Sequence, residues 1–226
     1  MIARLFLGLT DYRRFKSSIM KNVTGFFISL LIAASGYAQR NKQISVAFLN
    51  TGSAYPFAEF GKLITTVQHP GIELGYGFNW KTKPKHDWFH EFKLSYFYHR
   101  FVQHVIPLYT DIGYRYKFSS SLSAQASLGA GYMQSIPATA KLKLDANANG
   151  EYKKDKGIGR AQAIAVVGFS IGYIIHSSVK NAPRFFITYQ QFLQTPFVKA
   201  YVPILPYNSL LIGCRIPFRS HKKIAS

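Results

Sequence analysis

Residues 71–80 read GIELGYGFNW, and in this stretch large apolar side chains alternate without exception with small or polar ones. One parity holds Ile72, Leu74, Tyr76, Phe78 and Trp80, and the other holds Gly71, Glu73, Gly75, Gly77 and Asn79. Because successive side chains of a β-strand point to opposite faces, this period of two predicts a strand with one bulky face and one polar face. If many such strands turn their bulky faces to lipid and enclose the polar ones, the fold is a transmembrane β-barrel.

The same alternation recurs in seven further segments, at residues 44–49, 88–99, 106–118, 122–134, 161–175, 184–194 and 208–218. Most of these segments run ten residues or more, whereas strands of soluble proteins average about 5–6 residues. A tilted membrane-spanning strand needs about 9–11 residues, so the lengths favour a bilayer. We therefore expect one all-β domain, an antiparallel eight-stranded transmembrane β-barrel. Its polar lumen should be filled, because eight strands leave room only for side chains.

The connections between these segments divide into two sets. Residues 50–70, 100–105, 135–160 and 195–207 would lie at one end of the barrel, and residues 81–87, 119–121 and 176–183 at the other. All but one of the first set are longer than every member of the second. Outer-membrane barrels have short periplasmic turns and longer extracellular loops, so we expect the first set outside the cell.

Over residues 44–218 the chain resembles the small eight-stranded outer-membrane β-barrel proteins of Gram-negative bacteria. The resemblance rests on the strand pattern and on residues 209–218, which look like the aromatic-ending terminal strand that such proteins present to their assembly machinery. It implies a location in the cell outer membrane. Residues 219–226 depart from the pattern as a short basic C-terminal tail.

Residues 20–38 are interpreted as a secretory signal peptide. Lys21 gives a charged start, residues 23–34 form a short apolar run, and residues 36–38 end in Ala38 as a small-residue cleavage site. Residues 1–19 then read as an over-extended start. The barrel domain is assigned to residues 39–218.

The chain is strongly basic, with a formal net charge of +19. An exported protein with dispersed basic residues is expected to meet lipid phosphates rather than nucleic acid. We therefore expect outer-membrane lipid and lipopolysaccharide as partners, with another membrane protein as a further candidate, and a monomeric chain. Cys214 is the single cysteine, so an internal disulfide is excluded.

Charged residues on the polar faces predict an ionic network in the lumen, because a buried charge without a partner costs several kcal/mol. The expected members are Glu73, Glu91, Lys93, Asp111, Arg115 and Arg215. Rings near the ends of the short connections predict an aromatic belt at the periplasmic boundary. Its expected members are Trp80, Trp88, Tyr116, Phe118, Phe185 and Phe218.

The function predicted from this pattern is a structural, adhesion or accessory role through the extracellular loops, without an open pore. One alternative is a barrel enzyme acting on outer-leaflet glycolipid, in which His99 or His104 would be the base near Asp111. No nucleophile, base and orienting group stand at a recognisable spacing. A second alternative is a soluble periplasmic lipid carrier, whose bulky faces would point inward around a ligand.

No cofactor or metal is expected. Residues 145–150 match the first half of a calcium-binding loop, but Lys156 stands where the loop requires a bidentate Glu. An ordinary Asn-Gly turn explains the match. His86 and His90 are four residues apart on a predicted strand rather than a helix, so they do not indicate a metal pair.

Overall fold

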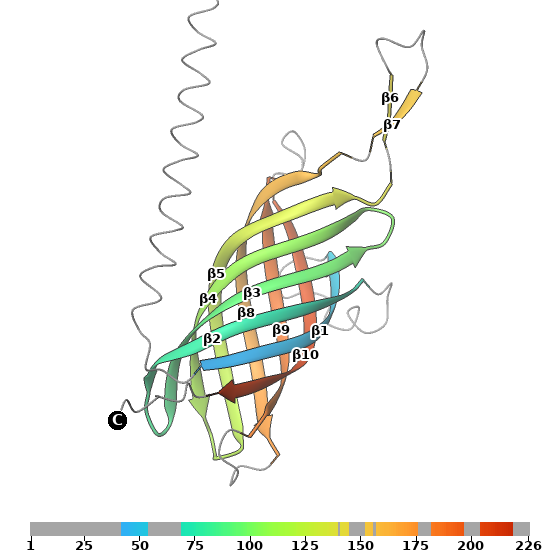
Figure 1. Ribbon diagram of the computed structural model, residues 1–226. Helices are drawn as coiled ribbons and strands as arrows, with labels where there is room; N and C mark the ends of the chain where they lie inside the picture. The colour runs from blue at the N-terminus through green and yellow to red at the C-terminus, as the bar shows by residue number, and fades with distance from the viewer. Residues whose placement is uncertain are drawn as a thin grey trace, which may run out of the picture. The chain divides into compact units, whose positions relative to one another are not determined.

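The computed structural model describes residues 42–53, 69–139, 141–144, 152–155, 157–175, 182–196 and 204–218. Eight strands form a closed antiparallel barrel in the order β1-β10-β9-β8-β5-β4-β3-β2 (Figure 1). These strands are β1 (Lys42–Ser53), β2 (Pro70–Thr82), β3 (His86–His99), β4 (Gln103–Lys117), β5 (Leu122–Pro137), β8 (Arg160–Ile174), β9 (Arg184–Thr195) and β10 (Leu205–Phe218). β6 (Lys141–Leu144) and β7 (Tyr152–Asp155) pair with each other as a separate two-stranded sheet.

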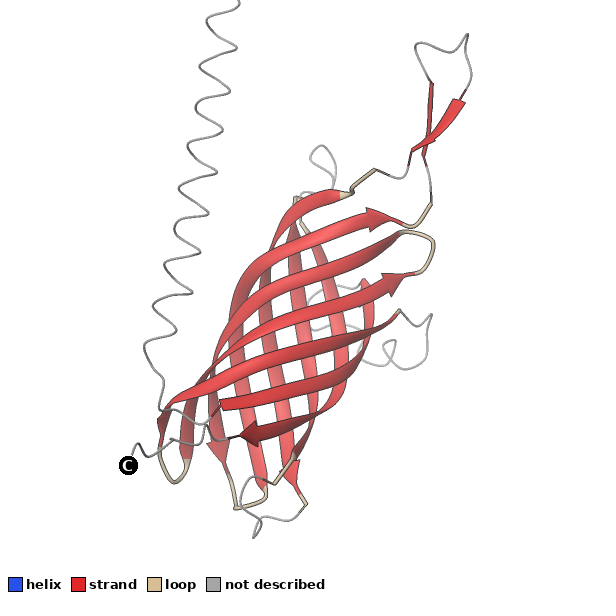
Figure 2. Cartoon of the chain, in the orientation of Figure 1, coloured by secondary structure: helices blue, strands red, loops and turns tan. Residues whose placement is uncertain are grey.

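All eight predicted strands are present, and the described residues of the barrel are strands joined by loops (Figure 2). β1 is longer than predicted, because its pairing with β10 continues past the apolar run to Ser53. In this last part of the strand the residues on both faces are polar or small. The barrel closes where β1, in blue, lies beside β10, in dark red, with Lys42 opposite Phe218 and Ser53 opposite Tyr207 (Figure 1). A closed barrel leaves no unpaired sheet edge.

The two faces of the wall are oriented as the sequence predicts. On β10, Leu211 is 1% exposed and its neighbour Ile212 is 58% exposed. On β2, Glu73 is buried and Ile72 is exposed. The exposed bulky residues therefore form the outer wall, while the charged residues point into the barrel together with a cluster of buried apolar side chains. The soluble carrier predicted as an alternative requires the opposite arrangement, so this hypothesis is wrong.

The ends of the barrel differ, and we name them by their connections. The turn end carries the connections at residues 83–85, 118–121 and 175–183 and both termini of the barrel, Lys42 and Phe218. The loop end carries the connections at residues 54–69, 100–102, 138–159 and 196–204. In the described part of the chain, no helix is long and apolar enough to cross a membrane.

Small departures from the regular pattern occur in β2 and in its neighbour. The pairing of β2 with β3 shifts between Asn79 and Lys81, so Trp80 is an extra residue in a bulge. Phe78 has outward parity but is only 8% exposed, because the rings of the outer wall cover it, including His90 at 5.4 Å. The bulky face of β2 is thus less uniformly exposed than its sequence suggests.

Candidate functional site

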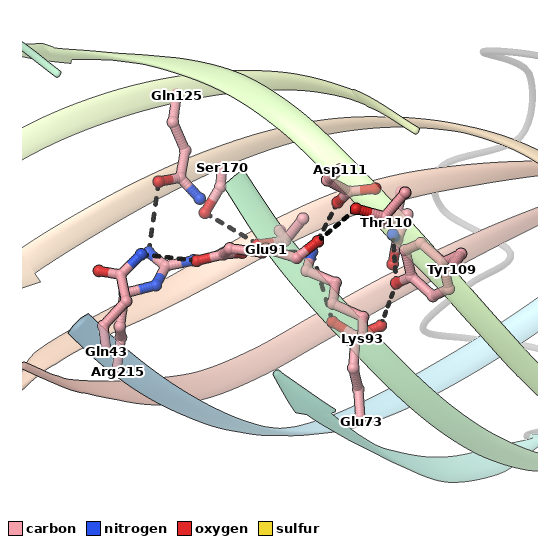
Figure 3. Close-up of polar contacts among 12 residues, drawn as sticks. Gln43, Glu73, Glu91, Lys93, Tyr109, Thr110, Asp111, Gln125, Ser170 and Arg215 are labelled. Atoms are coloured by element: carbon pink, nitrogen blue, oxygen red, sulfur yellow. Dashed lines mark hydrogen bonds and ion pairs between the residues drawn. The ribbon is translucent and has the colours of Figure 1, made fainter. Parts of the chain in front are cut away.

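The centre of the lumen holds one lysine among three carboxylates (Figure 3). Lys93 Nζ lies 2.9 Å from Asp111 Oδ2, 3.6 Å from Glu73 Oε1 and 3.6 Å from Glu91 Oε2. These residues meet because β2, β3 and β4 are adjacent and Glu91 is directly opposite Asp111 in the register. All four side chains are almost fully buried. We name Glu73, Glu91, Lys93 and Asp111 the central cluster.

Glycines on neighbouring strands make room for the central cluster. A Cβ atom at Gly129 would lie 2.1 Å from Asp111 Oδ1 and 2.5 Å from the carbonyl oxygen of Thr110. Such distances are below any real Cβ contact, so no larger residue fits at Gly129 without displacement of the backbone. The small faces of the strands therefore create the space that the long charged side chains fill.

The three carboxylates differ in how much they depend on Lys93. Glu73 accepts hydrogen bonds from the hydroxyls of Ser95, at 2.8 Å, and Tyr109. Glu91 pairs with Arg215 Nη2 at 2.9 Å and accepts a bond from Gln43 Nε2 at 2.9 Å. For Asp111, which is 0% exposed, Lys93 is the ion-pair partner and Oδ1 has no hydrogen-bond donor among the described residues. Asp111 is thus the carboxylate most dependent on the lysine.

Below the central cluster, toward the turn end, the lumen is filled by arginine side chains. Arg215 Nη1 donates to Gln125 Oε1 at 3.3 Å, and Arg115 Nε donates to the same oxygen at 3.1 Å. The guanidinium of Arg115 lies over the ring of Phe89, with 5.0 Å between Cζ and the ring centroid. Arg215 lies in the same way over Phe186, at 4.9 Å.

Arg115 pairs with a residue that the predicted network lacks. Its Nη1 lies 3.5 Å from Asp87 Oδ2, and Asp87 also pairs with Lys117 Nζ at 2.7 Å. Asp87 is directly opposite Arg115 in the β3–β4 register, whereas the prediction placed Asp87 in a turn and gave Arg115 the central carboxylates. The parity of Asp87, which it shares with Glu91, is the signal that could have found it.

Above the central cluster, toward the loop end, the lumen is closed by apolar packing. Phe97 and Tyr207 stand with their ring centroids 5.7 Å apart, and Tyr109 contacts Phe192 at 5.5 Å. Gln103 Nε2 donates to the hydroxyl of Tyr207 at 2.9 Å. Phe97, Phe192 and Tyr207 are each 0% exposed, so water does not reach this layer from the loop end.

An apolar outer wall around an enclosed polar lumen, with the backbone groups of every strand paired to a neighbouring strand, is the arrangement that permits strands to cross hydrocarbon. The chain forms a transmembrane β-barrel. No protein-family model and no curated protein matches the sequence.

Solved structures of small outer-membrane barrels are similar in fold. The attachment invasion locus protein Ail of Yersinia pestis, in complex with the heparin analogue sucrose octasulfate, is 13% identical, with a TM-score of 0.43 over 80% of this chain and 99% of that chain. Neisserial surface protein A is 10% identical, with a TM-score of 0.47 over 79% of this chain and 96% of that chain. The outer membrane enzyme PagL is 11% identical, with a TM-score of 0.42 over 78% and 99%. Similarity of this degree concerns the fold alone.

The residues predicted for a catalytic site lie in three different surroundings. Asp111 is in the lumen with Lys93. His104 is on the outer wall, where its Nδ1 is 2.9 Å from the hydroxyl of Tyr96. His99 has inward parity at the loop end and packs against His69, with ring centroids 4.1 Å apart. The structure does not assemble His99, His104 and Asp111 into one site.

The rings predicted for the lower aromatic belt all lie near the turn end of their strands. Trp80, Trp88, Phe118 and Phe185 are exposed, and Tyr116 and Phe218 are partly covered by neighbouring rings. Tyr116 packs against Phe118 at 5.0 Å, and Phe218 contacts Tyr76 at 6.3 Å. Their role as a belt at a membrane boundary stays a prediction.

Two histidines of β3 also have partners within the barrel. His86 Nδ1 is 2.7 Å from the hydroxyl of Tyr114, and His90 Nε2 contacts the hydroxyl of Thr110. The predicted signal peptide at residues 20–38, the predicted C-terminal tail at residues 219–226 and the partial calcium-loop match at residues 145–150 lie outside the described residues.

Proposed function

We propose that the protein is a non-conducting outer-membrane barrel that acts as a rigid scaffold for the connections at its loop end. The observation that carries this proposal is the occluded lumen. An apolar layer of buried rings, the central cluster and a layer of arginines follow one another along the barrel axis. A lumen blocked at three levels leaves no continuous path for water or ions.

The orientation belongs to the same proposal. With the turn end in the periplasm, the loop end and its long connections face the outside of the cell, as in other barrels of this class. The rings at the turn end then form the lower aromatic belt, because amphipathic Trp and Tyr favour the level of the headgroups.

The contacts made by the loop end are proposed from charge. The longest connection, residues 138–159, carries Lys141, Lys143, Lys153, Lys154 and Lys156 against three acidic residues. Lysines at this level would meet the phosphates of lipopolysaccharide, a favourable contact at low and moderate ionic strength. The proposed role is therefore adhesion or an accessory function at the cell surface rather than transport.

Conductance across a planar lipid bilayer tests the absence of a pore. The refolded barrel, added at a concentration at which a sixteen-stranded porin gives discrete steps, should give none. Well-defined steps from the wild-type protein would refute the proposal. The loop contacts are tested by comparing wild type with a chain in which Lys141, Lys143, Lys153, Lys154 and Lys156 are changed to Gln, using immobilised lipopolysaccharide. Equal retention of both proteins would exclude the lysine contacts while leaving the closed lumen intact.

A further inference from the structure

A hollow of about 460 Å³ opens at the turn end, between the turn at residues 83–85, the turn at residues 118–121 and the start of β9. Its charged lining residues are Lys85, Lys117 and Arg184. Serine hydroxyls supply the other polar groups, among them Ser121 and Ser123. No carboxylate of the described chain lines it. A cavity with three cations from three separate elements is suited to an anion.

The lumen immediately above the hollow also has more positive than negative charge. Its cations are Arg115, Lys117, Arg184 and Arg215, and the carboxylates that face them are Asp87 and Glu91. Arg184 is directly opposite Arg215 in the β9–β10 register, an arrangement in which like charges repel. Arg115 and Arg215 both donate to Gln125 Oε1, at 3.1 Å and 3.3 Å, so these two guanidinium groups also lie close together. This half of the lumen is therefore not neutralised by the described carboxylates.

The arginines also have donors without acceptors. Arg115 is 1% exposed, and its Nη2 has no hydrogen-bond partner among the described residues. The same is true of the buried Nε of Arg184 and of Arg215. Buried donors are nearly always satisfied in folded proteins. Of these three arginines Arg184 lines the hollow, so its unsatisfied Nε indicates that an acceptor belongs there.

The backbone at this level accommodates the pocket. A Cβ atom at Gly172 would lie 2.9 Å from Arg184 Cδ and 3.2 Å from Ser123 Oγ. The absence of a side chain at Gly172 thus lets Arg184 and Ser123 stand side by side at the wall of the hollow. Ser123 Oγ donates to the carbonyl oxygen of Gly172 at 3.3 Å, so Arg184 is the group at this position that can bind an oxyanion.

We propose that this hollow binds a phosphate group, presented as a free phosphate, a soluble phosphate ester or the headgroup of a phospholipid. Arg184 supplies a planar fork for two phosphate oxygens, Lys85 and Lys117 supply point charges, and the serines of the turn at residues 118–121 supply hydroxyl donors. A phosphate anion there offsets part of the excess of positive charge that the described carboxylates leave. This site is independent of the proposed surface role and lies at the opposite end of the barrel.

The test is a titration of the purified, folded barrel in an uncharged glycoside detergent with inorganic phosphate. Sodium chloride of matched ionic strength is the reference, because simple screening acts equally with both salts. Isothermal titration calorimetry should show saturable binding of phosphate, and the thermal unfolding midpoint should rise with phosphate concentration. A response no larger than that to chloride would overturn the proposal.

Two variants and one matched control locate the site. R184Q should weaken phosphate binding at least tenfold by removing the fork. K85Q should weaken it severalfold, and since Lys85 is an exposed turn residue its loss does not threaten folding. K81Q removes an exposed lysine at the same end of the barrel, outside the lining of this hollow, and should leave binding within twofold. Equal effects of K85Q and K81Q would mean that phosphate responds to general surface charge and would overturn the site.

A second arm separates the sources of phosphate. The titration is repeated with the barrel in nanodiscs of phosphatidylglycerol. If inorganic phosphate still binds with the detergent affinity, the site serves a soluble ligand. If binding of inorganic phosphate is lost in wild-type nanodiscs, while K85Q changes the phosphorus NMR signal of the bound headgroup, the site holds lipid. Loss of binding without any headgroup signal sensitive to K85Q would contradict the assignment to a phosphate site in the membrane.

Discussion

Replacing Lys93 by Met tests the ionic packing of the lumen most sharply. The substitution keeps a long unbranched side chain and removes the cation that lies within 3.6 Å of three carboxylates. Removing one partner of a buried ion pair typically costs about 3–5 kcal/mol, because the other charge stays buried and unpaired. We expect K93M to lower the free energy of unfolding by about this amount, which is two to four powers of ten in the unfolding equilibrium constant.

The loss of Lys93 should destabilise the three carboxylates to different degrees. Glu73 keeps its two hydroxyl donors, and Glu91 keeps Arg215 and Gln43. Asp111 loses its ion-pair partner, so most of the cost should arise there. The double variant K93M/D111N removes both charges and should recover more than half of the lost stability, a coupling of about 2 kcal/mol.

The assay is reversible urea unfolding of the barrel in phospholipid vesicles, followed by tryptophan fluorescence and by mobility on gels without boiling. K81M, at an exposed lysine, is the control and should change stability by less than about 0.5 kcal/mol. The reasoning fails if K93M unfolds at the same urea concentration as K81M. It also fails if K93M/D111N is no more stable than K93M.

Three further predictions concern glycine, lipid contact and pH. G129A should lower the free energy of unfolding by about 1–3 kcal/mol, since its Cβ would meet Asp111 and the backbone of Thr110. G168A is the matched variant and should lower it by less than about 1 kcal/mol, because the nearest neighbours of its Cβ are Ser127 Oγ at 2.8 Å and Thr188 Cγ2 at 4.0 Å. Equal unfolding midpoints of the two variants would contradict this. L128R, on the outward face of β5, should cost about 2–4 kcal/mol in vesicles if it lies near the bilayer midplane, and an unchanged midpoint would show that Leu128 does not face hydrocarbon. Burial lowers the pKa of His69, so as the pH falls the unfolded chain is protonated at this residue before the folded chain. The free energy of unfolding should therefore fall as the pH drops below about 6.5. In H69N this part of the pH dependence should disappear, and identical pH profiles for wild type and H69N would refute the prediction.

The eight strands and the direction of their faces could be predicted from the sequence, because a period of two is a local property. Ile72 and Glu73 are adjacent, and each face follows directly from the alternation. The full length of β1 could not be predicted. At Asn50 and Thr51 both faces carry polar residues, and Asn50 Oδ1 accepts a hydrogen bond from the backbone of His69 at 2.8 Å. A polar pair of this kind resembles a loop in sequence.

The partners of the charged residues depend on register, which composition does not give. Arg115 pairs with Asp87 because the short turn at residues 83–85 extends β3 down to His86 and sets the two residues opposite each other. The hollow at the turn end could likewise not be predicted, because its lining residues come from two turns and a strand that lie far apart in the sequence. Local pattern thus gave which residues face inward, and three-dimensional pairing decided which of them meet.

The claim on which the rest depends is that the apolar wall faces lipid. Methyl groups of the labelled protein in nanodiscs can be tested directly for nuclear Overhauser effects to lipid acyl chains. We predict such effects for Ile72, Leu94, Leu128 and Ile212, and none for Ala47, Leu49, Val105 and Leu211. Acyl-chain contacts at Leu211 and their absence at its neighbour Ile212 would contradict the account.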